Sequence, residues 1–88
     1  MEFMVFTLPG CAKCDRVKEL LKVKGLQAKE FDVSTKDGKN KIRDYLKMLR
    51  RDSSGSIIIP TLIVEENGQA TAVLNSVEEL DLWLKSRV

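Results

Sequence analysis

The two cysteines of the chain, Cys11 and Cys14, stand two residues apart in the stretch LPGCAKCDRVKELL. They follow a short apolar run and precede apolar residues at helical spacing, so the pair lies where a strand passes into a helix. Two thiols three residues apart on a helix are close enough to form a disulfide after a small local adjustment. This spacing predicts dithiol redox chemistry, with a metal site and inert packing as the alternatives.

A closed zinc site needs four ligands, mostly Cys and His. The chain has two cysteines and no histidine, so a metal would need carboxylates, an external thiol such as glutathione, or a second chain. An iron–sulfur cluster shared between two subunits stays open in this way. Inert packing is common for a single cysteine, but it does not account for two at one strand-to-helix turn.

The position of Cys11 suggests how a dithiol would work. If Cys11 caps the helix, the amides of Lys13 and Cys14 can donate to its sulfur. The positive end of the helix also favours the thiolate, which lowers the pKa of the Cys11 thiol. Cys11 is therefore the expected nucleophile, and Cys14, one turn further in, resolves the mixed disulfide. Gly10 has no side chain and leaves room for a substrate backbone beside Cys11.

Length and composition indicate one globular domain over residues 1–88, with 43% hydrophobic and 32% charged residues. The net charge is only +2 and aromatic residues are few, which argues against nucleic-acid binding. No apolar run approaches the roughly 20 residues that span a bilayer, and no basic leader precedes the N-terminal run. We expect a monomeric cytoplasmic protein without a membrane partner, in a compartment where permanent disulfides are rare.

Four strands are expected, over residues 3–8, 27–33, 61–64 and 70–74, the first of them buried on both faces. The Asn67-Gly68 pair between the last two runs predicts a tight hairpin.

Three helices are expected between and after these strands. The first covers about residues 12–24 and ends near Gly25. The second is amphipathic, and its apolar stripe consists of Ile42, Tyr45, Leu46 and Leu49. The third presents an apolar face made of Val77, Leu80, Trp83 and Leu84.

The third helix begins with a capping box, in which the Ser76 hydroxyl binds the Glu79 amide and the Glu79 carboxylate binds the Ser76 amide. The resulting order is β-α-β-α-β-β-α. The first two strands are joined through a helix and must be parallel with a right-handed crossover. The expected fold class is α/β, a mixed four-stranded sheet with helices on its faces.

The Cys-x-x-Cys pair, a proline before the third strand and this order of elements together resemble the glutaredoxin branch of the thioredoxin-like fold. The best local matches are CAKC with its helix, IIIPTLIV and NSVEEL. The resemblance implies that Pro60 follows a cis peptide bond and faces the active-site sulfur. It also implies that the backbone of Ile59 pairs with bound glutathione or peptide as an added strand does.

The resemblance implies further groove contacts, and here the chain departs from the family pattern. Leu8 stands where a basic residue is common, and Lys13, at the groove edge, stands where an aromatic residue is common. A pair of glycines is replaced by Ala72 and Val73. The region that grips the glutathione amino group in the family holds Asn75 and Ser76, although Ser76 also suits a helix cap. These departures predict a changed reductant or partner, with Lys13 offsetting some of the lost positive charge.

The sequence therefore predicts a thiol–disulfide oxidoreductase that reduces protein disulfides or glutathione mixed disulfides through Cys11 and Cys14. No cofactor or metal is expected to be bound, and glutathione could serve as co-substrate. Three alternatives stay open: an electron donor recharged by a thioredoxin reductase, a glutathione-assisted iron–sulfur module, and a non-catalytic adaptor.

Overall fold

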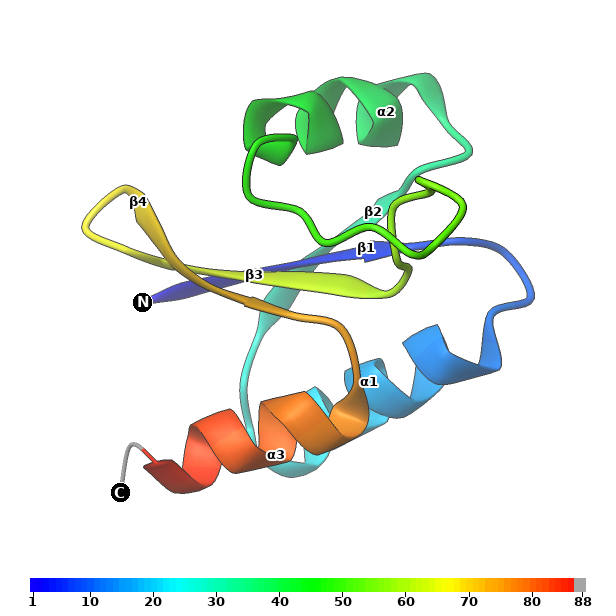
Figure 1. Ribbon diagram of the computed structural model, residues 1–88. Coiled ribbons are helices and arrows are strands. Elements are labelled where there is room, and N and C mark those ends of the chain that lie inside the picture. The colour runs from blue at the N-terminus through cyan, green and yellow to red at the C-terminus, as the bar shows by residue number, and fades with distance from the viewer. Residues whose placement is uncertain (87–88) are drawn as a thin grey trace.

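The computed structural model describes residues 1–86, and its elements follow the expected order (Figure 1). The strands are β1 (Glu2–Thr7), β2 (Ala28–Asp32), β3 (Thr61–Glu66) and β4 (Gln69–Leu74). The helices are α1 (Ala12–Val23), α2 (Lys36–Ile42) with the short 3-10 helix η1 (Arg43–Tyr45), and α3 (Val77–Ser86).

The four strands form one mixed sheet in the order β2-β1-β3-β4. β1 is parallel to β2 and antiparallel to β3, so that Phe3 lies between Ala28 and Val64. β3 and β4 form the expected antiparallel hairpin. Its turn residues Asn67 and Gly68 have φ angles of 54° and 79°, the positive values that a tight hairpin turn requires. The expected α/β fold, a mixed four-stranded sheet with helices, is therefore confirmed.

β1 is buried on both faces, as predicted, because helices cover both sides of the sheet (Figure 1). Phe3 and Val5 pack into a core beneath α1 and α3, where Val17 and Leu21 also lie, and Met4 and Phe6 point into a second core beneath α2. Successive side chains of a strand point to opposite faces, so one apolar strand supplies both cores.

The predicted second helix is shorter than its apolar stripe. α2 ends at Ile42, η1 carries the chain to Tyr45, and Leu46 lies outside the helix with 39% of its surface exposed. In a 3-10 turn side chains repeat every three residues, which keeps Ile42 and Tyr45 on the core and turns Leu46 outward. The Tyr45 hydroxyl donates to Glu65 Oε2 at 3.0 Å, which ties η1 to β3.

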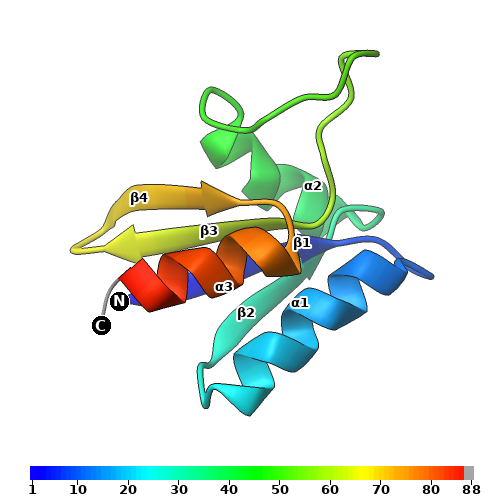
Figure 2. The ribbon, with the colours of Figure 1, turned by 60° about the horizontal axis from the view of Figure 1, so that its bottom comes forward.

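The cysteine end of the sheet is opposite to the end where β1 begins. β1 runs toward Cys11, whereas the start of β1 and the C-terminal end of α3 lie together at the other end (Figures 1 and 2). Between η1 and β3 the chain makes a long irregular excursion and returns to the cysteine end at Pro60. Within residues 1–86, no helix has the length and apolar character needed to cross a membrane.

Candidate functional site

The cysteine pair occupies the N-terminus of α1. Cys11 is the N-cap residue in an extended conformation, and the Cys14 amide donates to its Sγ at 3.1 Å. The cap expected at Cys11 is therefore present, with the Cys14 amide as its donor. The two sulfurs are joined in a disulfide, and the Cα atoms lie 5.3 Å apart. The spacing thus allows the ring to close without disturbing the helix that it begins.

The two cysteines differ in their access to solvent. Cys11 is partly exposed, whereas Cys14 is 1% exposed and lies in the interior. Gly10, just before the pair, has a φ angle of +71°, and no atom lies within 4 Å of the position a Cβ would take there. The space beside Gly10 is therefore open. Solvent therefore reaches Cys11, whereas Cys14 is buried.

The loop before β3 lies beside this helix start. Thr61 pairs with Phe6 near the end of β1, so Pro60 sits at the end of the sheet that leads to Cys11. The Ile59–Pro60 peptide bond is cis, as the resemblance implied, and Pro60 is buried. Within the described part of the chain, no hydrogen bond uses the main-chain N–H or carbonyl of Ile59. An unpaired main-chain segment of this kind can accept an added strand.

A groove of about 270 Å³ runs from α1 across this loop to the start of α3. Its walls come from three separate parts of the chain and are formed by Lys13, Arg16, Ile58, Ile59, Asn75, Ser76, Val77 and Glu78. Two cations stand on the α1 side and one carboxylate on the α3 side. The groove therefore offers charges of both signs around an apolar floor.

The start of α3 is held by a modified capping box. The Glu79 amide donates to Ser76 Oγ at 3.1 Å, as predicted, but the Glu79 carboxylate accepts from the amide of Asn75 at 2.8 Å instead of that of Ser76. The same carboxylate receives Arg50 Nη1 at 2.7 Å. Burial alone would raise the pKa of Glu79, but the bonds from Asn75 and Arg50 outweigh it and lower that pKa below its ordinary value. The box therefore reaches one residue further back than predicted, and Arg50 binds its carboxylate as well.

Four of the predicted contact residues, Lys13, Ile59, Asn75 and Ser76, thus line one groove. Gly10 and Pro60 lie at the cysteine end of the sheet but are not part of its wall. Their contact with substrate, like that of the four wall residues, stays a prediction.

The sequence reasoning did not place Arg16 or Glu78 in this groove. Arg16 lies three residues after Lys13 on α1, and such spacing puts both on one helix face, so it could have been found. The place of Glu78 in the groove wall depends on where α3 begins relative to the loop before β3. No local sequence pattern indicates this.

A second hollow of about 510 Å³ lies at the other end of β1, between residues 1–3 and 25–29, away from the cysteines. Among residues 1–86 no three His, Cys, Asp or Glu side chains are grouped so as to hold a metal ion. Neither cysteine lines this second hollow, whereas the wall of the groove includes Lys13, which stands between the two cysteines.

Comparison with known proteins gives the family. The family model for glutaredoxin matches residues 3–69, which include the cysteine pair and the loop before β3. No curated protein matches the chain.

Solved structures agree with this assignment. The thioredoxin-like protein BC3987 is 26% identical, with a TM-score of 0.61 over 92% of this chain and 97% of its own. A point mutant of the same protein gives 28% identity and a TM-score of 0.63 over 94% and 99%. A malarial protein that is 17% identical shares the fold, with a TM-score of 0.61 over 100% and 99%. With its dithiol at the start of α1 and the family match over most of its length, this chain belongs to the glutaredoxin family.

Proposed function

We propose that this glutaredoxin-family protein is a thiol–disulfide oxidoreductase that reduces protein disulfides or glutathione mixed disulfides. The observation that carries the proposal is the state of Cys11: the residue is partly exposed, its sulfur accepts a hydrogen bond from the Cys14 amide, and it is joined in a disulfide to buried Cys14. The family and the cysteine pair establish a thiol redox function. The substrate and direction of exchange are what we propose.

The reaction begins from the reduced dithiol. The Cys11 thiolate attacks one sulfur of the substrate disulfide, a new S–S bond forms, and the other substrate sulfur leaves as a thiolate that takes up a proton. Cys14 then gives up its proton and attacks Cys11 Sγ, which releases the second substrate thiol. Two electrons pass to the substrate, and the enzyme is left with the Cys11–Cys14 disulfide.

The groove supplies a means of holding the substrate during this exchange. The unpaired main chain of Ile59 can bind an extended segment that flanks the substrate disulfide. Lys13 and Arg16 can attract carboxylates on the same segment. Peptides and glutathione both carry these groups, so both are candidate substrates for the groove.

The electron source is the second part of the proposal. Either glutathione or a thioredoxin reductase would return the Cys11–Cys14 disulfide to the dithiol. Ala72 and Val73, which replace the glycines of the resembled family, lie in the regular part of β4 and keep their side chains partly buried. This feature favours testing thioredoxin reductase beside glutathione. We place the reaction in the cytoplasm, where the dithiol would be kept reduced.

The test uses the wild-type protein and two single variants in two assays. One assay supplies a glutathione mixed disulfide with glutathione and its reductase, and the other a disulfide-linked peptide with thioredoxin reductase. Cys11→Ser should be inactive in both. Cys14→Ser should keep the attack but not the resolution, and should accumulate as a covalent adduct with the peptide. Disulfide reduction that survives in Cys11→Ser would overturn the proposal.

A further inference from the structure

The side chain of Asn75 is tied to the loop before β3. It is 9% exposed, and its Nδ2 lies 3.2 Å from the Ile58 carbonyl, 3.1 Å from the Pro60 carbonyl and 3.1 Å from Thr61 Oγ1. The Thr61 hydroxyl itself donates to the Ile58 carbonyl at 2.6 Å. One amide nitrogen at the end of β4 thus holds three oxygens of the loop.

The chemistry of these partners fixes which way the amide faces. Carbonyl oxygens only accept hydrogen bonds, so the Asn75 nitrogen must face Ile58 and Pro60. The amide oxygen, Oδ1, is buried and has no hydrogen-bond partner among the described residues. Leaving a buried acceptor unpaired is costly. The orientation of the Asn75 side chain is therefore held by its two N–H donors.

These hydrogen bonds lie on both sides of Ile59, the residue whose main chain we propose binds the substrate. The Ile58 N–H donates to the Arg50 carbonyl at 3.1 Å, and the carbonyls of Ile58 and Pro60 are held by Asn75. From Ile58 to Pro60, only the main-chain groups of Ile59 have no partner in the described part of the chain. With both neighbours fixed, Ile59 has little freedom to turn.

Asn75 is in turn held in place by the start of α3. Its own amide donates to Glu79 Oε1 at 2.8 Å, and Arg50 joins this carboxylate to the Val73 carbonyl, to which Nη2 donates at 3.2 Å. Bonds to its main chain and to its side chain therefore orient Asn75 together. The loop before β3 is connected through it to α3 and to β4.

We propose that Asn75 is a positioning residue that keeps the Ile59 main chain presented to the substrate. It acts through its buried amide donors and not through direct contact with the reacting sulfurs. The proposal rests on the disulfide exchange proposed above. It predicts that losing the donors impairs the binding of an extended substrate and leaves the Cys11 thiol itself unchanged.

Asn75→Asp is the sharpest variant, because it keeps the size and replaces the donor with an oxygen that faces two carbonyl oxygens. Asn40→Asp, on the exposed side of α2, is the control with the same change of charge. We expect KM for a disulfide-linked peptide to rise at least about tenfold in Asn75→Asp and to stay within about twofold in Asn40→Asp. Alkylation of reduced Cys11 by iodoacetamide, which needs no groove, should change less than about twofold in either variant.

An unchanged KM in folded Asn75→Asp would overturn the proposal, and so would a Cys11 alkylation rate that falls in step with catalysis. A second measurement needs neither catalysis nor a variant. The side-chain NH₂ protons of Asn75 should exchange with solvent much more slowly than those of Asn67, which lies exposed in the hairpin turn. Equal exchange rates would show that the amide is not held. A wild-type protein that reduces no disulfide but protects these protons would overturn only the proposed function.

Discussion

The junctions β1–α1 and β2–α2 are built alike and behave differently. Each strand leads to an extended N-cap residue whose side chain accepts a hydrogen bond from the amide three residues later, at 3.1 Å in both. The caps are Cys11 and Thr35. The third helical residue is Cys14 in one helix and Gly38 in the other, and both are buried.

The difference lies in the atoms that occupy this shared geometry. At α1 the cap atom is a sulfur that can ionise, and the third residue places a second sulfur against it. At α2 the cap is a hydroxyl, and the Cβ that Gly38 lacks would collide with the Asp32 carbonyl oxygen. The first junction is open and carries two thiols, and the second is closed by its own backbone. Both helix starts supply the same capping hydrogen bond. Whether a redox reaction is possible there depends on the side chains at the N-cap and at the third helical residue.

The largest effect on activity should come from replacing the Cys11 cap of α1 with a hydroxyl cap like that of α2. Cys11→Ser keeps an oxygen acceptor at the cap and removes the nucleophile, so disulfide reduction should fall at least about 100-fold. The unfolding free energy of the reduced protein should change by less than about 0.5 kcal/mol, because serine is a good N-cap. Steady-state assays and urea unfolding under reducing conditions measure the two quantities. A large loss of stability would show that the two caps are not equivalent.

The next largest effect, on stability, should come from adding a side-chain atom at Gly38, in the β2–α2 junction. Gly38→Ala adds the Cβ that meets the Asp32 carbonyl, so α2 must shift, at a cost of about 1–3 kcal/mol in unfolding free energy. Alanine is intrinsically the better helix former by about 1 kcal/mol, so the sign of the result is informative. Asn40→Ala, in the exposed part of the same helix, is the control and should be neutral or slightly stabilising. Stabilisation by Gly38→Ala would contradict the close approach.

Removing the inert cap should cost less. Thr35→Ala leaves the Gly38 amide without its acceptor and should lower the unfolding free energy by about 1 kcal/mol. Thr35→Ser, which keeps the hydroxyl, should restore most of this loss. Disulfide reduction should stay within about twofold in both variants, because this cap contacts no reacting group. If activity fell sharply, the two junctions would not be independent.

The smallest effect on stability should come from the start of α3, where the contribution of Glu79 depends on pH. The lowered pKa of Glu79 means that its ionised form stabilises the fold above its ordinary pKa of 4.5, and that this contribution is lost as pH falls through the lowered value. Glu79→Gln should therefore be less stable than wild type near pH 6, by less than about 1 kcal/mol because the side chain is partly exposed. The difference between the two proteins should shrink as the pH falls through the lowered pKa of Glu79, because its carboxylate is then protonated. A difference that persists in acid would point to a cause other than ionisation.

Much of this arrangement could be predicted from local pattern. β1 was predicted to be buried on both faces because its residues are apolar without alternation, and the hairpin because Asn67 and Gly68 tolerate positive φ angles. The Cys11 cap followed from the place of the pair between a strand and a helix. These signals lie within a few residues of each other, so that short-range rules are sufficient to interpret them.

What could not be predicted depends on contacts between distant residues. α2 ends at Ile42, and Tyr45 of the following 3-10 helix binds Glu65, 20 residues along the chain. The apolar stripe of this segment carries no sign of that bond. The capping box binds the amide of Asn75 and includes Arg50, which lies 29 residues before Glu79. Asn75 was assigned to the substrate region through the resemblance, but its bonds to Ile58 and Pro60 appear only once the loop is placed beside β4.

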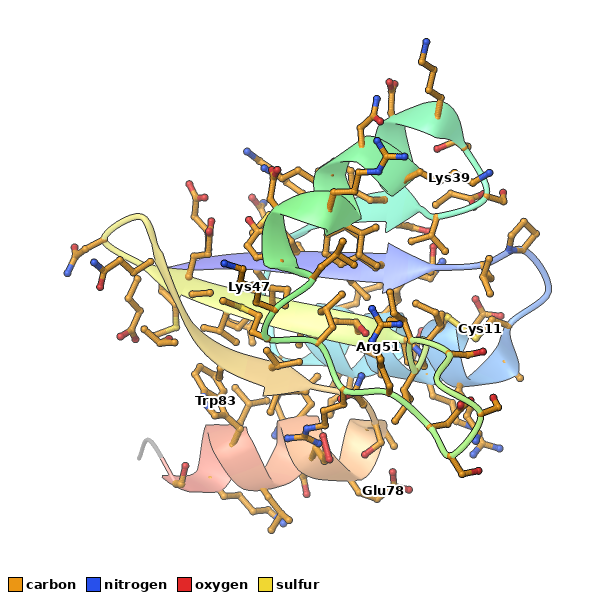
Figure 3. All side chains as sticks on the ribbon, turned by 45° about the horizontal axis from the view of Figure 1, so that its top comes forward. Cys11, Lys39, Lys47, Arg51, Glu78 and Trp83 are labelled. Carbon is orange, nitrogen blue, oxygen red and sulfur yellow. A yellow bond between two sulfur atoms is a disulfide. The ribbon has the colours of Figure 1, made fainter. Side chains whose placement is uncertain are left out.

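The position of the chain ends has a practical consequence. β1 starts, and α3 finishes, at the end of the molecule remote from Cys11 (Figure 3 shows Cys11 and Trp83 well apart). A linker attached at the start of β1 or at the end of α3 would therefore lie away from Cys11. The protein could be coupled at these ends to an electrode, a resin or a neighbouring domain. Its two thiols would stay accessible for redox reactions, and the groove beside them would not have to be redesigned.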